Sequence, residues 1–505
     1  MGTTNAAAIL RQEEAQDSKL SPNTVVDSRY TKFELREKQL EAVHFLEKRN
    51  GRAGLFMQQR TGKTRTALAY LHDRANRILV VCTSSTFGSW QEEIALFPCY
   101  SDYTVIALTD SQTVAQRGDR LRRIGALQDR LIVLVNIEAY WREALRLALV
   151  NWKPDAVVID EAHRLKHHTS KQSKFSHILA ERPYVKYCIA LTGTPITKGL
   201  EDVYSLFRFI DPKIFGTRWV EFRDRYLRMG GFSGKQIIGY KNEEELQQKV
   251  ASASFRVTRD ECFDIPPVQH ILHPVFLDNG TSKSYLEMKK KGLIQLDGKD
   301  ENGNPLTGVA LANIALTTVM RLQQITSGFC VLEDTQTLDI STEKLESCCD
   351  LVTESVDGGD QVVIFCRFSR DVKRLFEILS KSYKVGLLEG SIKADDRTTI
   401  IRAFRQKQLD VIVAQIQVAS MGIDLATAGT CIFYSTPFSF DTFQQARDRL
   451  QGPTQQKSVG YYYLLAKLST GAQTVDNVVY TALDKRQSLA QTILRDPIAV
   501  KSILG

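Results

Sequence analysis

Three consecutive residues, Gly62, Lys63 and Thr64, have the types that bind the phosphates of a nucleotide. Glycine lets the backbone approach an anion closely, and successive N–H groups at a helix start can cradle a β-phosphate. The lysine would neutralise charge on the β- and γ-phosphates, and the threonine hydroxyl would bind Mg²⁺. A helical pattern follows over 65–72. On its own the tripeptide is also compatible with an ordinary helix start, because the strict motif requires glycine where Met57 stands.

Two adjacent carboxylates, Asp160 and Glu161, end the apolar run 156–160. Ligands of α/β proteins bind at the carboxyl ends of strands, so both acids are well placed for chemistry. Asp160 could hold Mg²⁺ through water, and Glu161 could polarise an attacking water. The alternative is a pair of acids that only closes a strand into a turn. Ninety-seven residues separate Lys63 from Asp160, an interval that suits opposite edges of one nucleotide-binding sheet. Together the two motifs predict ATP hydrolysis.

The elements that position these residues are short runs rich in Val, Ile and Leu. They lack clean alternation, which predicts strands buried on both faces and therefore parallel sheets covered by helices. The eight runs are 77–82, 131–136, 156–160, 188–192, 361–366, 385–388, 411–414 and 430–435. They form two groups of four, separated by a long middle region with helical patterns. Those patterns are 200–209, 243–253 and 316–326.

We therefore predict an α/β protein with two parallel-sheet lobes and a helical insertion between them. The expected divisions are a flexible polar tail, a first lobe that binds ATP, a helical bridging region and a second lobe. Their boundaries are 1–27, 28–212, 213–342 and 343–505.

Composition bounds the class of protein. The 505 residues are 43% apolar and 25% charged, which is ordinary for globular proteins and excludes a mostly disordered chain. The nine cysteines are scattered and form no Cys-x-x-Cys pair, so we do not expect a zinc ribbon. Their odd number, without a disulfide framework, suits the reducing cytoplasm. We see no signal peptide and no apolar run long enough to span a bilayer, and expect no membrane partner. The net charge of +8 permits an anionic partner without requiring one.

Further motifs make the chain resemble the Swi/Snf-type ATPases of helicase superfamily 2, over roughly residues 30–470. In the first half these are Leu-Arg-Glu-Lys-Gln-Leu-Glu-Ala-Val at 35–43, Asp-Glu-Ala-His-Arg-Leu-Lys at 160–166, Leu-Thr-Gly-Thr-Pro at 191–195, the segment 200–212, Phe-Arg-Val-Thr-Arg at 255–259 and Ile-Pro-Pro at 265–267. In the second half they are Val-Val-Ile-Phe-Cys-Arg-Phe at 362–368, Leu-Glu-Gly-Ser at 388–391 and Met-Gly-Ile-Asp-Leu at 421–425. Asp424 stands where the family has Asn, and Phe438 where it often has Trp.

The resemblance implies two RecA-like lobes with ATP in the cleft between them. It implies catalytic roles for Lys63, Asp160, Glu161, Gln445 and Arg449, with Mg²⁺ held by Thr64 and Asp160. Gln39 would read the adenine base. The residues expected to bind the nucleotide are Arg36, Gln39, Thr61, Gly62, Lys63, Thr64, Arg65, Gly422 and Asp424.

The resemblance also implies that a DNA duplex lies across both lobes and that the motor steps along it as the cleft opens and closes. Hydroxyls, amides and one arginine in loops at strand ends suit contacts to phosphates, which position DNA without reading its sequence. For each of them, capping of a loop is the alternative. The candidates are Thr83, Ser84, Asn136, Thr192, Arg367, Gln415 and Gln417.

Two departures from the family bear on catalysis. In the last motif, Gln-x-x-x-Arg-x-x-Arg, Gln445 and Arg449 fit, but the second arginine is replaced by Gly452. Arg447 points to nearly the opposite helix face and cannot simply replace it. In the phosphate loop, Arg60 stands where relatives have glycine. One hypothesis is that Arg60 brings its charge to the phosphates and partly offsets the missing arginine; the alternative is a loop arginine that faces solvent.

The leading interpretation is an ATP-dependent translocase on double-stranded DNA that remodels DNA or protein–DNA complexes. Two alternatives stay open: a strand-separating or branch-processing helicase, and an ATP-gated DNA clamp that hydrolyses weakly. With no accessory domain visible, the chain is close to a bare motor of bacteriophage or prokaryotic type. We expect the protein to be a monomer. We expect it in the cytoplasm, associated with the nucleoid, and in the host cytoplasm if a phage encodes it. Branched DNA is a further possible substrate.

Overall fold

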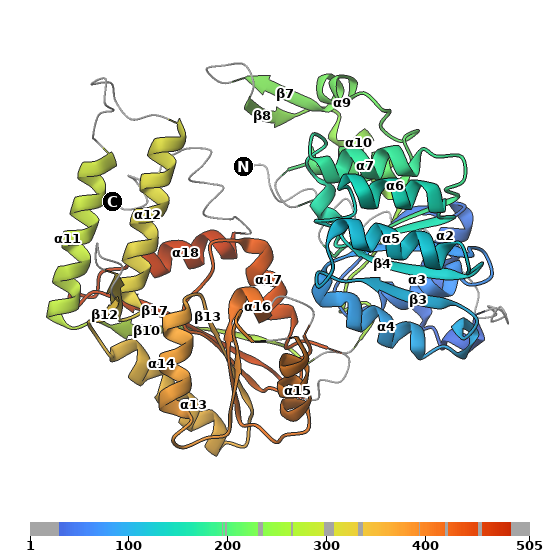
Figure 1. The fold of residues 1–505 in the computed structure, drawn as a ribbon. Coiled ribbons are helices and arrows are strands. Elements are labelled where there is room, and N and C mark those ends of the chain that lie inside the picture. Colours follow the sequence, from blue (N-terminus) through green and yellow to red (C-terminus); the bar gives the residue numbers. More distant parts are fainter. Residues whose placement is uncertain are drawn as a thin grey trace.

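The chain folds into two α/β lobes (Figure 1), and the elements of the middle region, 213–342, are divided between them. The computed structural model describes residues 30–193, 195–196, 199–230, 236–263, 266–296, 308–331, 337–392, 394–419, 423–452 and 457–485. The expected tail, 1–27, lies outside them. None of the helices described has the length and apolar content that crossing a bilayer would take.

Lobe 1 is built on a seven-stranded parallel sheet in the order β3-β4-β2-β5-β6-β1-β9. Every residue of its strand β4 is buried, as expected for a strand covered on both faces. The strands are β1 (Arg52–Met57), β2 (Arg77–Cys82), β3 (Thr104–Leu108), β4 (Leu131–Asn136), β5 (Ala156–Asp160), β6 (Tyr187–Leu191) and β9 (Ser254–Val257).

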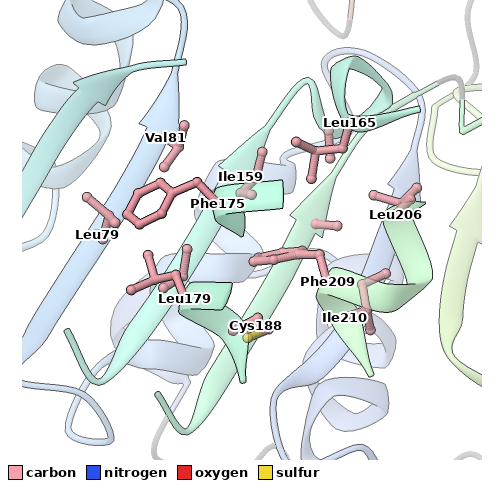
Figure 2. Packing of buried hydrophobic residues seen from close by; sticks show 14 of the residues in the cluster. Leu79, Val81, Ile159, Leu165, Phe175, Leu179, Cys188, Leu206, Phe209 and Ile210 are labelled. Atoms are coloured by element: carbon pink, nitrogen blue, oxygen red, sulfur yellow. The ribbon is translucent and has the colours of Figure 1, made fainter. Parts of the chain in front are cut away.

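Helices cover both faces of this sheet, and each face has its own apolar core. One face packs against α2 (Glu37–Lys48), α3 (Lys63–Leu71) and α4 (Phe87–Ala95). The other packs against α5 (Val114–Gly125), α6 (Glu143–Trp152), α7 (Lys171–Ala180) and α8 (Asp202–Ile210). In Figure 2, Phe175 and Leu179 of α7 lie against Leu79 and Val81 of β2. Short 3₁₀ turns complete the lobe: Thr31–Phe33, Ser84–Thr86, Pro98–Tyr100 and Ala162–Leu165.

Lobe 2 has a six-stranded parallel sheet in the order β10-β17-β16-β13-β15-β14. Its strands are β10 (Gln269–Phe276), β13 (Val362–Cys366), β14 (Val385–Leu388), β15 (Val411–Gln415), β16 (Thr430–Phe433) and β17 (Gly460–Lys467). Its helices are α13 (Glu343–Asp357), α14 (Ser369–Leu379), α15 (Ala394–Arg405), α16 (Ile416–Ala419), α17 (Phe440–Asp448) and α18 (Val475–Asp484). The prediction of two parallel-sheet α/β lobes is confirmed.

The middle region holds helices, as predicted, and it also supplies strands. Its remaining elements are α9 (Trp219–Tyr226), the hairpin β7 (Leu227–Gly230) and β8 (Gln236–Tyr240), α10 (Glu243–Ser252), α11 (Asn279–Leu296), α12 (Gly308–Thr326) and the hairpin β11 (Phe329–Val331) and β12 (Thr337–Asp339). Strands β9 and β10 follow one another in the chain but join different lobes. The eight runs named from the sequence therefore do not account for every strand of the two sheets: they leave out β1, β17 and the edge strands β3, β9 and β10.

The strand order fixes where a site can form. Strands β5, β6 and β1 are neighbours in lobe 1, so their carboxyl ends meet at one edge of the sheet. Met57 ends β1, Asp160 ends β5 and Leu191 ends β6. This edge carries the phosphate loop and the pair of acids, and the end of α17 from lobe 2 contacts it.

Candidate active site

The phosphate loop connects β1 to α3, which begins at Lys63. Gly62 adopts a left-handed φ of +90°, and a Cβ there would overlap the side-chain amide of Gln39. That amide donates from Nε2 to the carbonyl oxygen of Thr61 at 3.0 Å. The glycine is thus needed both for its conformation and for the close approach of Gln39. Gln39, predicted to read the base, lies directly against the loop.

Lys63 is held across the loop by its own backbone. Its Nζ donates to the carbonyl oxygens of Met57 at 2.9 Å and Gln58 at 3.2 Å. Burial lowers the pKa of Lys63, and the nearby charges of Glu161 and Asp160 oppose that shift. The lysine and the two acids therefore share one electrostatic site.

Asp160 and Glu161 are adjacent buried acids with different environments. Asp160 Oδ2 accepts from the indole Nε1 of Trp90 at 3.1 Å, and burial beside Glu161 raises the pKa of Asp160. Glu161 has a left-handed φ of +49°. Burial alone would raise the pKa of Glu161, but His163, Lys63 and Arg449 together hold it below its ordinary value. Glu161 is therefore the acid of the pair that is ionised most readily.

His163 connects the acid pair to the next strand. Its Nδ1 lies 3.3 Å from Glu161 Oε2 and 3.3 Å from the hydroxyl oxygen of Thr192, just after β6. His163 is buried, and so is Thr192. The histidine therefore links Glu161 to Thr192, the residue that follows β6.

The two residues predicted to bind a magnesium ion supply one carboxylate, from Asp160, and one hydroxyl, from Thr64. Asp160 ends β5, and Thr64 is the second residue of α3. Among the described residues no three His, Cys, Asp or Glu side chains form a metal cluster. Mg²⁺ commonly takes one or two protein ligands and completes its shell with water and phosphate oxygens, so this donor set fits the ion.

Lobe 2 presents the end of α17 to this site. Gln445 is half-buried one turn before Arg449, which stands at the helix end. Burial lowers the pKa of Arg449 to about 10, so it remains charged at neutral pH, and Glu161 is a nearby opposite charge. Arg447 points elsewhere: its Nη2 lies 2.7 Å from His270 Nε2. The prediction that Arg447 cannot replace the missing arginine agrees with this placement.

Two arginines of lobe 1 bind the end of α17. Arg60 donates to the carbonyl oxygens of Arg449 at 2.7 Å and Gln451 at 2.9 Å. Arg259 Nη2 lies 2.6 Å from Asp448 Oδ1. The side chain of Arg60 is only 15% exposed, so its interpretation as a solvent-facing loop arginine was wrong.

The other predicted nucleotide residues are spread around the loop. Arg65 Nε lies 2.7 Å from Glu93 Oε1, and Arg36 lies over the ring of Phe263. Asp424 Oδ1 lies 2.7 Å from Arg60 Nη2, so this lobe 2 residue does meet the phosphate loop. Gly422 lies outside the described residues.

Three of the predicted DNA contacts in lobe 1 lie at adjacent strand ends. Asn136 Nδ2 donates to Ser84 Oγ at 2.5 Å and to Asp110 Oδ2 at 3.1 Å. Ser84 also hydrogen-bonds Asp110, and the hydroxyl of Thr83 lies 3.0 Å from that of Ser85. The structure therefore brings Ser84 and Asn136 together, whereas Thr192 belongs to the His163 contact.

In lobe 2 the predicted DNA contacts differ in setting. The guanidinium of Arg367 lies 3.4 Å from the ring centroid of Phe438 and donates to Gln323 Oε1 at 2.8 Å. Burial lowers the pKa of Arg367 to about 10. Gln415 is half-buried at the end of β15, and Gln417 is exposed in α16.

Sequence reasoning did not assign site roles to Trp90, His163 or Asp448. His163 lies in the Asp-Glu-Ala-His run, so its position beside Glu161 was a usable signal. Trp90 and Asp448 gave none, because each meets its partner only through the tertiary fold: Trp90 is 70 residues from Asp160 and Asp448 is 189 from Arg259.

Comparison with known proteins finds two domain families along the chain. Residues 25–328 match the SNF2-related domain, and residues 343–451 match the helicase conserved C-terminal domain. Among relatives, the SWI/SNF chromatin-remodeling complex subunit snf22 of Schizosaccharomyces pombe is 25% identical over 83% of this chain and 26% of that protein. The ISWI chromatin-remodeling complex ATPase CHR17 of Arabidopsis thaliana is 23% identical over 88% of this chain and 41% of that protein.

A bacterial relative and a solved structure are also similar. The "Uncharacterized ATP-dependent helicase MG018" of Mycoplasma genitalium is 27% identical over 69% of this chain and 31% of that protein. The chain thus spans well under half the length of these relatives. The Sulfolobus solfataricus SWI2/SNF2 ATPase core in complex with dsDNA aligns with 95% of this chain and 96% of that chain, at 22% identity and a TM-score of 0.39.

Proposed function

This chain belongs to the Swi/Snf-type ATPases of helicase superfamily 2, and from that membership we propose that it hydrolyses ATP to translocate on double-stranded DNA. The work done would be remodelling of DNA or of protein–DNA complexes. The observation that carries the proposal is the contact between the lobes at the phosphate loop, where Arg60 of lobe 1 donates to the carbonyl oxygen of Arg449 in lobe 2 at 2.7 Å. In agreement with this contact, the charges of both Lys63 and Arg449 help to lower the pKa of Glu161. Hydrolysis would therefore depend on how the lobes stand relative to each other, which is what a motor requires.

Each side chain has a role that its setting supports. Lys63 binds phosphate oxygens and opposes their charge. Glu161, ionised at neutral pH, accepts a hydrogen bond from the attacking water and orients it; its depressed pKa makes it a positioning group more than a strong base. Arg449 stabilises charge that develops on the transferred phosphoryl group. Thr64 and Asp160 would hold Mg²⁺, whose chemistry there would be neutralisation of charge on the phosphates.

The DNA part of the proposal rests on the strand-end loops of both lobes. Ser84 and Asn136 form one polar cluster in lobe 1, and Arg367 adds a cation in lobe 2. Contacts of this kind bind the sugar–phosphate backbone without reading bases, so the grip can be released and renewed at each step.

The test is ATP turnover with single-stranded, duplex or branched DNA and without DNA. We expect duplex to stimulate turnover most, and Glu161→Gln to abolish it while ATP binding persists. A protein that hydrolyses no faster with duplex than without would contradict the proposal. Efficient strand displacement on a forked duplex would instead identify a strand-separating helicase.

A second candidate is an ATP-gated DNA clamp, and one observation favours it. Glycine replaces the second arginine of the last motif at position 452. Because an arginine finger can contribute about 10³–10⁵ in rate, its loss favours slow hydrolysis. A clamp would bind duplex tightly when ATP is present and hydrolyse it slowly. Rapid DNA-stimulated turnover that Glu161→Gln removes would exclude this candidate.

A further inference from the structure

Arg60 belongs to the phosphate loop of lobe 1, but its guanidinium contacts acceptors in lobe 2. It adopts a left-handed φ of +68°, a conformation that non-glycine residues rarely take. Its guanidinium meets three acceptors: Asp424 Oδ1 at 2.7 Å, Arg449 O at 2.7 Å and Gln451 O at 2.9 Å. A planar group with five donors suits such a set, whereas an ammonium would not reach all three in one position.

The end of α17 is shaped to receive this side chain. A Cβ built on Gly452 would overlap Arg60 Nη1, and it would lie 3.3 Å from Cδ and 3.4 Å from Cζ. Any other residue at this position would therefore have to displace the guanidinium. The guanidinium of Arg60 can therefore occupy this place because residue 452 has no side chain.

The contact bears directly on Arg449. The carbonyl oxygen of Arg449 accepts from Arg60 and also from the backbone N–H of Leu425 at 3.0 Å. These two bonds fix the backbone of Arg449, whose charge helps to lower the pKa of Glu161. Arg259 supports the same segment through Asp448 and, at 3.4 Å, through the carbonyl oxygen of Gln451.

We propose that Arg60 is a positioning residue that fastens the phosphate loop to the end of α17, with Gly452 as its required complement, and so sets the place of Arg449 relative to Glu161. The inference rests on the proposed function, since the consequence would be seen in ATP turnover. It replaces the hypothesis that Arg60 itself meets the phosphates, because the guanidinium is committed to acceptors in lobe 2.

The first test compares steady-state ATPase parameters of the full chain with duplex DNA. Misplacement of a reacting group by about 1 Å can cost about 10²-fold in rate, so we expect Arg60→Ala to lower kcat by about 10–100-fold. KM for ATP should change little, because Lys63 and Thr61 are untouched. Arg60→Lys should recover part of the loss. Arg405→Ala is the matched control: Arg405 is 58% exposed and lies 4.0 Å from the same Asp424.

The second test is a double-mutant cycle at positions 60 and 452. Gly452→Ala should lower kcat when Arg60 is present and have no further effect in the Arg60→Ala background. Equal losses in both backgrounds would show that Gly452 acts through its own backbone, which would overturn the proposal. Thermal melting of all four proteins checks that each is folded.

The third test does not depend on hydrolysis. Hydrogen exchange of the full chain without nucleotide should become faster in peptides that cover 440–452 when Arg60 is replaced by alanine, and not when Arg405 is. Unchanged exchange would overturn the proposed fastening even if turnover fell. If the unmodified chain fails to hydrolyse ATP at all, the proposed function fails, and the exchange result still decides whether Arg60 fastens the lobes.

Discussion

Arg259 of lobe 1 and Asp448 of lobe 2 form a buried ion pair across the lobe interface, with 2.6 Å between Nη2 and Oδ1. The two side chains are only 8% and 10% exposed. Gln58 of the phosphate loop accepts from the backbone N–H of Arg259 at 2.9 Å, which ties the pair to the loop. Because Asp448 directly precedes Arg449, closure of the lobes and placement of Arg449 depend on the same short segment.

We expect Arg259→Ala to separate the lobes without unfolding them. Loss of one partner from a buried ion pair leaves an uncompensated charge at a cost of about 3–5 kcal/mol. Asp448 can avoid that cost by regaining water when the lobes part, since its bond from Gln444 at 3.0 Å comes from its own helix. The radius of gyration from small-angle scattering should rise while the circular dichroism stays the same. Arg223→Ala, which breaks a more exposed pair with Asp224, is the control, and an unchanged radius for Arg259→Ala would contradict the prediction.

Trp90→Phe should raise the Mg²⁺ concentration needed for ATP hydrolysis. The substitution keeps a large ring in the buried site but removes the donor that orients Asp160 Oδ2. Loss of such an outer partner typically weakens metal binding about 10–100-fold. A Mg²⁺ titration of turnover measures the effect, and the limiting rate at saturating Mg²⁺ should fall much less. An unshifted titration would show that Trp90 serves only the core.

His177 should make the protein less stable as pH falls. Burial lowers its pKa from 6.5 to about 4, and it lies 2.9 Å from the carbonyl oxygen of Ser205. Since the folded pKa is below the unfolded one, its contribution is complete above pH 6.5 and is lost as pH falls towards 4. Between pH 8 and pH 5 the wild type should lose about 2 kcal/mol more than His177→Gln, whose amide can still donate to Ser205. Urea unfolding at both pH values measures the difference, in which other titrating groups cancel.

Arg367→Ala and Asn136→Ala should weaken duplex binding in distinguishable ways. If Arg367 neutralises a phosphate, its loss should reduce the salt dependence of binding by about one unit of slope. Asn136 is uncharged, so its loss should lower affinity at every salt concentration and leave the slope unchanged. Fluorescence anisotropy with a labelled duplex gives both numbers, with Arg123→Ala, an exposed arginine of α5, as the control. Identical slopes for all three variants would place Arg367 outside the DNA contact.

The fold was most predictable where strands lie in the middle of a sheet. Runs such as β2 and β4 are continuously apolar because helices cover both faces, and the sequence shows this directly. Strand β10 was missed because it is an edge strand with an exposed face and contains Pro274, which edges tolerate. Strand β1 was missed because Ala53 and Gly54 give it little β propensity; its place next to β6 is decided by packing.

The site was predictable where its residues are close in sequence. Lys63, Asp160 and Glu161 lie in local motifs with a clear chemical reason for each residue type. The role of Arg60 could not be seen, because its acceptors Arg449 and Gln451 are 389 and 391 residues away. Its left-handed backbone and its low exposure are properties of the assembled interface and leave no periodic pattern in the chain.

The connection between β9 and β10 affects how readily the two lobes meet again after they separate. Val257 ends a strand of one lobe and Gln269 begins a strand of the other, so a short connection ties the lobes together. Because this connection makes each meeting of the two surfaces an intramolecular event, it raises their effective concentration above that of two separate proteins. In the proposed motor, the arginine contacts between the lobes would then form again after each opening. Separation and return of the lobes would not require a high affinity between their surfaces.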